Sequence, residues 1–360
     1  MEAYSGFHPV NEILTRVAVD ATPRDQQLIA RDLLPPIPVD SLTGQVLVEN
    51  IRNFAGAGDL NIKRAPGADR ATLSEHDRGT PVSFSLDCYS LQKSFAIEHA
   101  RLREFSQFPT PEETRVTRSV SRAVKLAVEN EVAGAITAAA SWPDAALGSL
   151  TGGTQVKWDL QTGKPLYDLT AIAELIRTGS GLGIKPDTVV MGHAVALAMS
   201  RNAEVRGLAG TFAQGLVVGP ATVTFSAVKQ AVAMTLDISP DRVFIGSARY
   251  ASANAGQTSP AYADSWGDYL WMGCLLGGDP MVGRANGSTR VTTGPVAALA
   301  LEGNIQGAAP GEPGMPAMLA GLYDNLPNGA AVRRYAWVDY YYEIVVLDST
   351  LGYLVTDLVG

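Results

Sequence analysis

The run Gly179-Ser180-Gly181-Leu182-Gly183 is the segment that most invites a nucleotide-binding interpretation. A phosphate-binding loop of that kind opens a helix that follows a strand, and its backbone N–H groups contact the phosphates. This run instead follows a predicted helix, and position 184 is Ile, so the dinucleotide fingerprint fails. Gly163-Lys164 is followed by Pro165 rather than by Ser or Thr, which excludes the other common phosphate loop. We therefore predict that the glycines end a helix.

The histidines offer little catalytic chemistry. No Ser lies in a Gly-x-Ser-x-Gly elbow, and neither zinc-ligand nor EF-hand spacing occurs. His193 begins a predicted short helix after a strand, where catalytic residues of α/β enzymes often lie. A local hydrogen-bonding role is favoured, because no nucleophile or second base is near it in the sequence. Two others have acidic neighbours and are predicted to be solvated, His76 and His99, and none of the four, His8 included, belongs to a His-x-x-x-His pair. We expect no catalytic residue, cofactor or metal.

A basic stripe marks the predicted helix 111–141. Four side chains at helical spacing form it: Arg115, Arg118, Arg122 and Lys125. Such a stripe is either a solvated face or a strip that contacts carboxylates of a neighbour or nucleic acid. Four charges supply only weak, salt-sensitive attraction to phosphates, so both interpretations stay open.

The helix that carries this stripe has clear start and stop signals. Thr110 is a good N-cap, Pro111 suits the first turn and Glu113 completes a capping box. Trp142-Pro143 ends the helix. Its apolar face is predicted to consist of Val116, Val120, Val124, Ala127 and Val128. About 30 residues at roughly 1.5 Å each give a rod of about 45 Å, which is long for a globular domain.

Composition sets limits on the class of protein. The chain has 360 residues, and its net charge of −8 argues against tight binding to a phosphate backbone. The two cysteines, Cys88 and Cys274, show no ligand spacing and suit a reducing compartment. The first residues lack the pattern of a signal peptide, and no apolar stretch reaches the length of a membrane span.

Two N-terminal segments have no evident core of their own. Residues 1–42 contain five prolines and are predicted to form an extended arm. Residues 43–95 are predicted to form two strands around a loose, glycine-containing middle. A two-stranded ribbon is marginally stable alone, so we expect it to rest on another surface, with a neighbouring subunit as the natural candidate.

The rest of the chain alternates between helices and strands. Helices are predicted at 168–178, 193–200 and 226–236, with a buried strand at 188–191. Residues 302–316 are predicted to be a glycine- and proline-rich loop, and 332–359 to be β-strands. The sharpest signal is a strand and small-residue turn at 242–250, followed by an aromatic strand within 264–271.

In this order, the segments resemble the major capsid proteins of tailed phages with the Hong Kong 97-type fold. Trp158-Asp159 and the segment 184–192 are similar to segments common in that family. The resemblance implies an α+β fold with four parts. They are an N-terminal arm (1–42), an E-loop hairpin (43–94), a P-domain with a spine helix at 111–141 (95–150 and 326–360), and an A-domain (151–325).

The resemblance also implies a function. It predicts a structural, non-enzymatic subunit that forms hexamers and pentamers of an icosahedral shell around double-stranded DNA. The shell would assemble in the host cytoplasm and become the virion capsid, with portal, scaffolding or decoration proteins as further partners and no membrane. Predicted assembly contacts are the basic stripe and the ribbon tip, which contains Arg64, Pro66, Gly67, Asp69 and Arg70. Two alternatives stay open: an encapsulin-type compartment, and an α/β enzyme with a site near His193.

Overall fold

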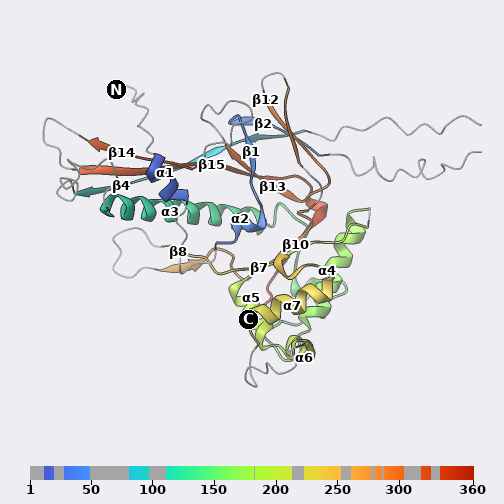
Figure 1. The fold of residues 1–360 in the computed structure, drawn as a ribbon. Helices are drawn as coiled ribbons and strands as arrows, with labels where there is room; N and C mark the ends of the chain where they lie inside the picture. Colours follow the sequence, from blue (N-terminus) through green and yellow to red (C-terminus); the bar gives the residue numbers. More distant parts are fainter. Residues whose placement is uncertain are drawn as a thin grey trace, which may run out of the picture.

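A computed structural model describes residues 12–19, 28–48, 81–96, 111–181, 183–212, 223–252, 261–276, 280–285, 288–303, 318–325 and 333–360. Within these residues the chain has an elongated part, built on a long helix and a long sheet, and a more helical part (Figure 1). No described helix is long and apolar enough to cross a membrane.

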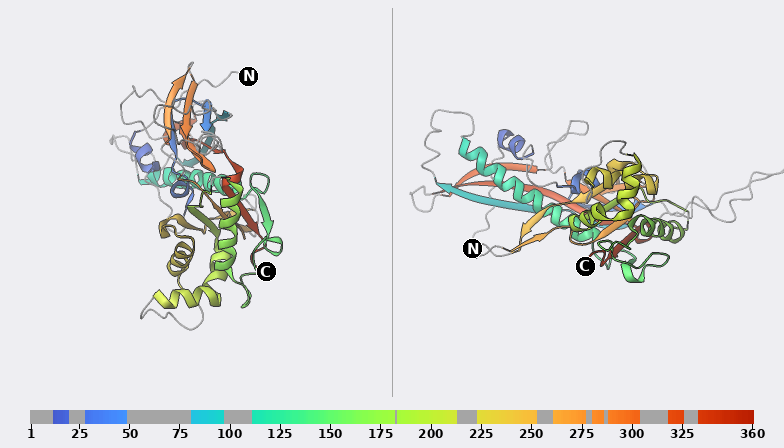
Figure 2. Two further views of the ribbon diagram at one scale, coloured as in Figure 1. Left: turned by 90° about the vertical axis from the view of Figure 1, so that its right-hand side faces the viewer. Right: turned by 90° about the horizontal axis from the view of Figure 1, so that it is seen from below.

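The elongated part is one sheet covered by a helix. Its strand order is β1-β13-β15-β14, and β4 pairs with the other side of β15. The strands are β1 (Ile37–Val39), β4 (Asp87–Ala96), β13 (Ala298–Gly303), β14 (Met318–Asn325) and β15 (Arg333–Val346). Helix α3 (Pro111–Ile136) runs along the sheet, as the view from below in Figure 2 shows.

Helix α3 buries the predicted valines at i, i+4 spacing. Val116, Val120, Val124 and Val128 are all buried, which confirms this face, whereas Ala127 is exposed and was wrongly assigned to it. The helix ends at Ile136 rather than at 141. The reason is Trp142, which is 4% exposed and packs edge-on against Trp271 in the helical part. The chain leaves the helix before residue 141, and the indole of Trp142 packs beside Trp271.

The helical part surrounds a second five-stranded sheet of order β5-β16-β10-β6-β7. Its strands are β5 (Asp144–Ala146), β6 (Thr188–Gly192), β7 (Val243–Gly246), β10 (Leu270–Gly273) and β16 (Gly352–Thr356). Its α-helices are α4 (Pro165–Gly179), α5 (His193–Arg201), α6 (Ala203–Phe212) and α7 (Phe225–Leu236), with 3-10 turns at Leu147–Ser149, Pro240–Arg242 and Ser349–Leu351. The predicted helices and the buried strand near 188–191 are confirmed.

The last strand contradicts the prediction that 332–359 forms one set of long strands. β15 belongs to the elongated sheet, but β16 lies between β5 and β10 in the other sheet. Gly352 is needed there, because a Cβ at this position would lie 2.6 Å from Cε3 of Trp142. The proposed domain limits remain a prediction, but residues 333–356 contribute one strand to each of the two sheets.

A third sheet carries the predicted ribbon. Its order is β11-β12-β2-β3, with β2 (Thr43–Val48), β3 (Val82–Ser85), β11 (Met281–Ala285) and β12 (Ser288–Thr293). β2 pairs with β3 on one side and with β12 on the other. The described bases of both strands therefore belong to a sheet of their own chain. A small hairpin joins β8 (Arg249–Ala251) and β9 (Tyr262–Asp264).

The described part of the N-terminal arm packs on its own chain and includes two short helices, so it is not extended throughout as predicted. Helix α1 (Glu12–Val19) contacts α3 and β14, and helix α2 (Ala30–Leu33) contacts α3. Leu14 and Leu33 are fully buried. β1 is an edge strand, which is where the sheet tolerates Pro38.

Candidate assembly surfaces

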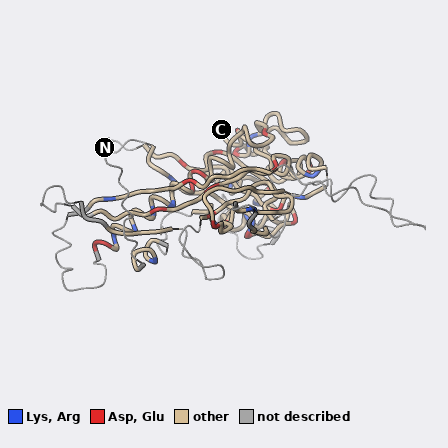
Figure 3. The backbone as a smooth tube through the Cα atoms, turned by 90° about the horizontal axis from the view of Figure 1, so that it is seen from above, with Lys and Arg blue, Asp and Glu red and all other residues tan. Residues whose placement is uncertain are grey.

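The basic stripe on α3 divides into two environments. Arg115, Arg118 and Arg122 are exposed, and Arg115 pairs with Glu112 through contacts of 2.6 and 2.9 Å. Lys125 is half-buried and lines a cleft instead. Figure 3 shows Lys and Arg interspersed with Asp and Glu along the described backbone, rather than gathered into one basic surface. The four residues of the stripe therefore do not share one environment.

Several predicted residues lie outside the described part of the chain. These are the five at the ribbon tip (Arg64, Pro66, Gly67, Asp69 and Arg70), three histidines (His8, His76 and His99) and the N-cap Thr110. The structure does not test whether the ribbon tip and the basic stripe meet. Both stay predictions as assembly contacts.

Glu129, which sequence reasoning missed, joins three parts of the molecule. It lies on α3 and is 1% exposed. Its carboxylate accepts hydrogen bonds from the backbone N–H groups of Ile29 (3.2 Å) and Ala30 (2.8 Å), at the start of α2. It also accepts one from Nε1 of Trp266, at 2.6 Å. The arm, the long helix and the helical part therefore meet at a single side chain.

Burial raises the pKa of the Glu129 carboxyl, although the hydrogen bonds from Trp266, Ala30 and Ile29 oppose that shift. Removing a carboxylate from water disfavours its charged form, and donors to the charged form favour it. The positive end of α2 adds little here, because that helix is only one turn long. The hydrogen bonds of Glu129 therefore connect the arm to α3, and an ion pair between Arg31 and Glu302 (3.4 Å) connects it to β13.

Two more polar contacts fasten the arm to the elongated part. Ser121 on α3 donates to the carbonyl of Ala18, at 2.5 Å. Thr15 on α1 donates to the carbonyl of Ala320 and accepts from its N–H, which makes it a cross-link to β14. In the sequence, Ser121 and Glu129 belong to a row of polar residues at i, i+4 spacing beside the valine face (Glu113, Thr117, Ser121, Lys125 and Glu129). Such a row is typical of a solvated helix face, so the spacing alone does not predict that Glu129 is buried.

A cleft of about 890 Å³ lies where the arm meets the other two parts. Its walls include cations and anions together, among them Lys125, Glu129 and Arg242. Arg242 contacts Oγ1 of Thr188 at 2.6 Å, and burial lowers the pKa of its guanidinium. With both signs of charge on its walls, the cleft has no preference for an anionic or a cationic ligand.

A carboxylate cluster lies between α3 and the sheet. Burial, together with the nearby charges of Asp87 and Glu131, raises the pKa of Glu343 from 4.5 to about 7. Three carboxylates that approach one another disfavour full ionisation. Among the residues described, no group of His, Cys, Asp and Glu has the arrangement of a metal site. The raised pKa of Glu343 makes stability depend on pH.

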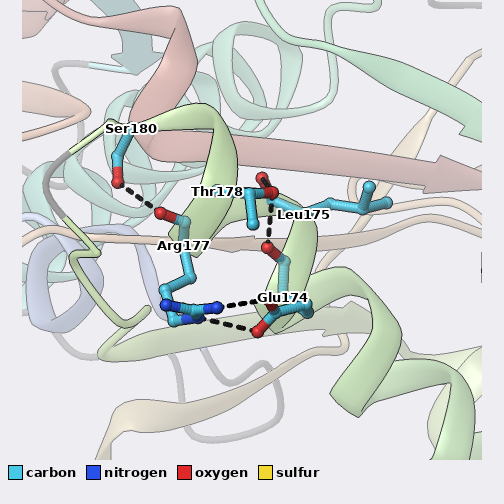
Figure 4. A network of polar contacts seen from close by, with 5 residues as sticks. All are labelled: Glu174, Leu175, Arg177, Thr178 and Ser180. Atoms are coloured by element: carbon cyan, nitrogen blue, oxygen red, sulfur yellow. Dashed lines mark hydrogen bonds and ion pairs between the residues drawn. The ribbon is translucent and has the colours of Figure 1, made fainter.

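The glycine run ends a helix, and His193 packs against an aromatic ring. Gly181 has a φ of +71° just after α4, and Ser180 donates to the carbonyl of Arg177 (Figure 4), which confirms the glycine run as a helix end. His193 packs edge-on against Phe225 with ring centroids 5.3 Å apart. Its buried Nδ1 has no hydrogen-bond partner among described residues, so the predicted local hydrogen bond at that nitrogen is not formed.

Comparison with solved structures assigns the fold. A phage-related protein from Bordetella bronchiseptica RB50 matches 98% of this chain and 99% of its own length, with a TM-score of 0.62 and 19% identity. The chain has a tailed-phage capsid-like fold. This confirms the predicted α+β, Hong Kong 97-like class. At 19% identity, the capsid-like fold is shared while the sequences have diverged.

Other solved structures with the capsid-like fold are more distant. A putative prophage capsid protein from E. coli CFT073 matches with 12% identity, 97% and 99% coverage and a TM-score of 0.47. An encapsulin from Synechococcus elongatus PCC 7942 matches with 14% identity, 97% and 96% coverage and a TM-score of 0.41. Scores this low add no weight to the assignment. No family model matches the chain, and no curated protein matches its sequence.

Proposed function

We propose that this chain is a structural shell subunit, the major capsid protein of a tailed phage. The observation that carries the proposal is the capsid-like fold shared over 98% of this chain. In the proposed assembly, copies form hexamers and pentamers that close an icosahedral shell around double-stranded DNA. Head-to-tail contacts with a closing rotation make rings, and rings of both sizes together tile a closed surface.

The charge of the chain fits this role. With a net charge of −8, the subunit would hold packaged DNA by confinement rather than by adhesion. Packaging would need a portal, and assembly would involve scaffolding or decoration proteins in the host cytoplasm. Assembled copies would be the capsid of the virion.

A structural rather than catalytic role is supported by the residues near His193. The described part of the chain brings no nucleophile or second base into hydrogen-bond contact with Nδ1 of that imidazole. The α/β enzyme alternative predicts a small discrete oligomer with a site there. The shell proposal instead predicts that activity is absent and that large particles form.

The direct test is negative-stain electron microscopy of the purified full chain, with size-exclusion chromatography alongside. Uniform icosahedral particles support the shell, whereas a monodisperse monomer or small oligomer at high concentration contradicts it. Nuclease-protected DNA inside particles purified from the phage-producing host supports the capsid. Protein cargo without DNA would instead identify an encapsulin-type compartment.

The predicted ribbon contacts can be tested by deletion. Removing residues 55–78 should leave soluble subunits that do not close shells, because we propose that the ribbon holds a neighbour. The matched comparison is Arg64→Ala combined with Arg70→Ala, which keeps the ribbon but removes two charges from its tip. Normal particles from the deletion would contradict the assignment of this segment.

A further inference from the structure

β4 is an open edge of the elongated sheet. It pairs with β15 over ten residues, and no other described strand pairs with its opposite side. Figure 2, seen from below, shows β4 along the outer margin of this sheet beside α3. Leu91, in the middle of the strand, is 43% exposed. An edge strand of this length without proline is a template for pairing with another chain, because its outward N–H and C=O groups lack strand partners.

The charges on β4 are complementary to themselves in one register. Asp87 and Lys93 are equally distant from Ser90 along the strand. If two copies of β4 pair antiparallel with Ser90 opposite Ser90, Asp87 lies opposite Lys93 at both ends. The same register places Tyr89 opposite Leu91. Opposite charges and aromatic–aliphatic pairs stabilise directly opposed positions, whereas like charges destabilise them.

We propose that β4 pairs antiparallel with β4 of a second copy, across a twofold axis at Ser90. The inference rests on the proposed function, because it specifies one contact between shell subunits. Registers that place Asp87 opposite Asp87, or Lys93 opposite Lys93, bring like charges together. The two charges therefore select one register and disfavour others, which is how edge charges normally restrict unwanted pairing.

The surroundings of β4 fit a continuous sheet. Nζ of Lys93 lies 3.3 Å from Oγ of Ser119 on α3, and the charge of Glu131 on α3 acts on Tyr89. Odd-numbered side chains of β4 therefore face α3. In the pair, both copies of α3 lie on the same face of the joined sheet, since the twofold axis is perpendicular to it. An interface of this kind is isologous, with the same surface used twice.

Disulfide trapping tests the register directly. In a Cys88→Ser background, Ser90→Cys places two thiols opposite each other, with Cα atoms about 4.5–5.5 Å apart. This lies within the range that a disulfide spans. Mild oxidation of assembled particles should convert most of the chain to dimers on a non-reducing gel.

The matched control is Gln92→Cys in the same background, on the same face of the strand. In the proposed register the two substituted positions are about four residues apart along the strands, roughly 14 Å, so no dimer should form. With native Cys88 restored, Gln92→Cys should form dimers, because residue 92 then lies opposite Cys88. Equal trapping of all variants, or no trapping of Ser90→Cys, would overturn the proposal.

Charge reversal separates assembly from folding. Asp87→Lys and Lys93→Asp should each lower particle yield at least several-fold at low salt, and the double variant should restore it. No rescue by the double variant would contradict the pairing. Particles that form without trapped dimers refute the β4 contact but not the shell. Trapped dimers without particles refute the shell but keep the contact.

Discussion

Asp168 in the helical part and Glu129 in the elongated part are both buried carboxylates. Their hydrogen-bond donors lie at very different distances from them along the chain. Asp168 accepts from Thr154 N–H and Oγ1 and from Nε1 of Trp158, all within 14 residues. The donors to Glu129 lie 99, 100 and 137 residues away. The helical part therefore satisfies its buried charge locally, whereas the elongated part does so by bringing remote segments together.

This difference indicates at which stage of folding each buried carboxylate obtains its hydrogen bonds. Local donors form their contacts as soon as one short stretch folds. Remote donors form theirs only after the arm, α3 and the helical part are in place, because closing long loops costs entropy before the contacts form. We expect the arm to be the part that substitutions can release without unfolding the helical part.

Val124→Asp should have the largest effect and would test whether α3 is needed by both parts. It buries an unpaired charge at a position that is 2% exposed, and we expect a loss of roughly 4 kcal/mol or more. Soluble yield and urea unfolding measure it. Ala127→Asp is the control on the exposed face of the same helix. Wild-type stability of Val124→Asp would show that this face is not core.

Asp168→Asn should destabilise the helical part by about 2–3 kcal/mol. The carboxylate accepts hydrogen bonds through both oxygens, whereas the NH2 group of Asn is itself a donor and would face one of those donors. Thermal unfolding with Trp fluorescence reports it, since Trp158 loses its partner. Protease resistance of the arm should not change. The exposed Asp159→Asn is the control; equal effects of the two variants would refute the local network.

Glu129→Gln should cost less, about 1–2 kcal/mol, since burial already disfavours the charge. Its signature is different: brief trypsin treatment should cut at Arg31 well before the helical part is digested. Asn130→Gln, at an exposed position on the same helix, is the control. An arm that stays protected in Glu129→Gln would contradict its role as the anchor.

The carboxylate cluster predicts a pH dependence specific to the elongated part. Burial raises the folded-state pKa of Glu343 to about 7, so between about pH 4.5 and 7 the folded state holds more protons than the unfolded state. Stability should fall as pH rises through this window and level off above it. Glu343→Gln should remove this fall in the free energy of unfolding with pH, which is below about 1 kcal/mol after solvent screening. Parallel wild-type and variant curves of unfolding against pH would contradict this.

Arg115→Ala should have the smallest effect and leave stability essentially unchanged, because the ion pair with Glu112 is exposed and spans one helical turn. Urea unfolding checks it. Reduced particle yield with unchanged stability would assign Arg115 to an assembly contact. Unchanged yield would favour the solvated-face interpretation of the basic stripe.

The sequence by itself determined the local elements. The valine face of α3, the buried strand β6, the helices of the helical part and the glycines that end α4 all follow from short-range periodicity and turn chemistry. The order of these elements was also enough to predict the capsid-like fold class. Such features depend on residues a few positions apart, so they are visible in one sequence.

Only the tertiary structure decided which surfaces these elements meet. It placed β16 in the second sheet, laid the arm on its own chain and gave Glu129 three remote donors. No local pattern encodes these choices, because each depends on packing between segments that lie far apart in the chain. A buried carboxylate is stable wherever enough donors converge, and the sequence around Glu129 does not contain them.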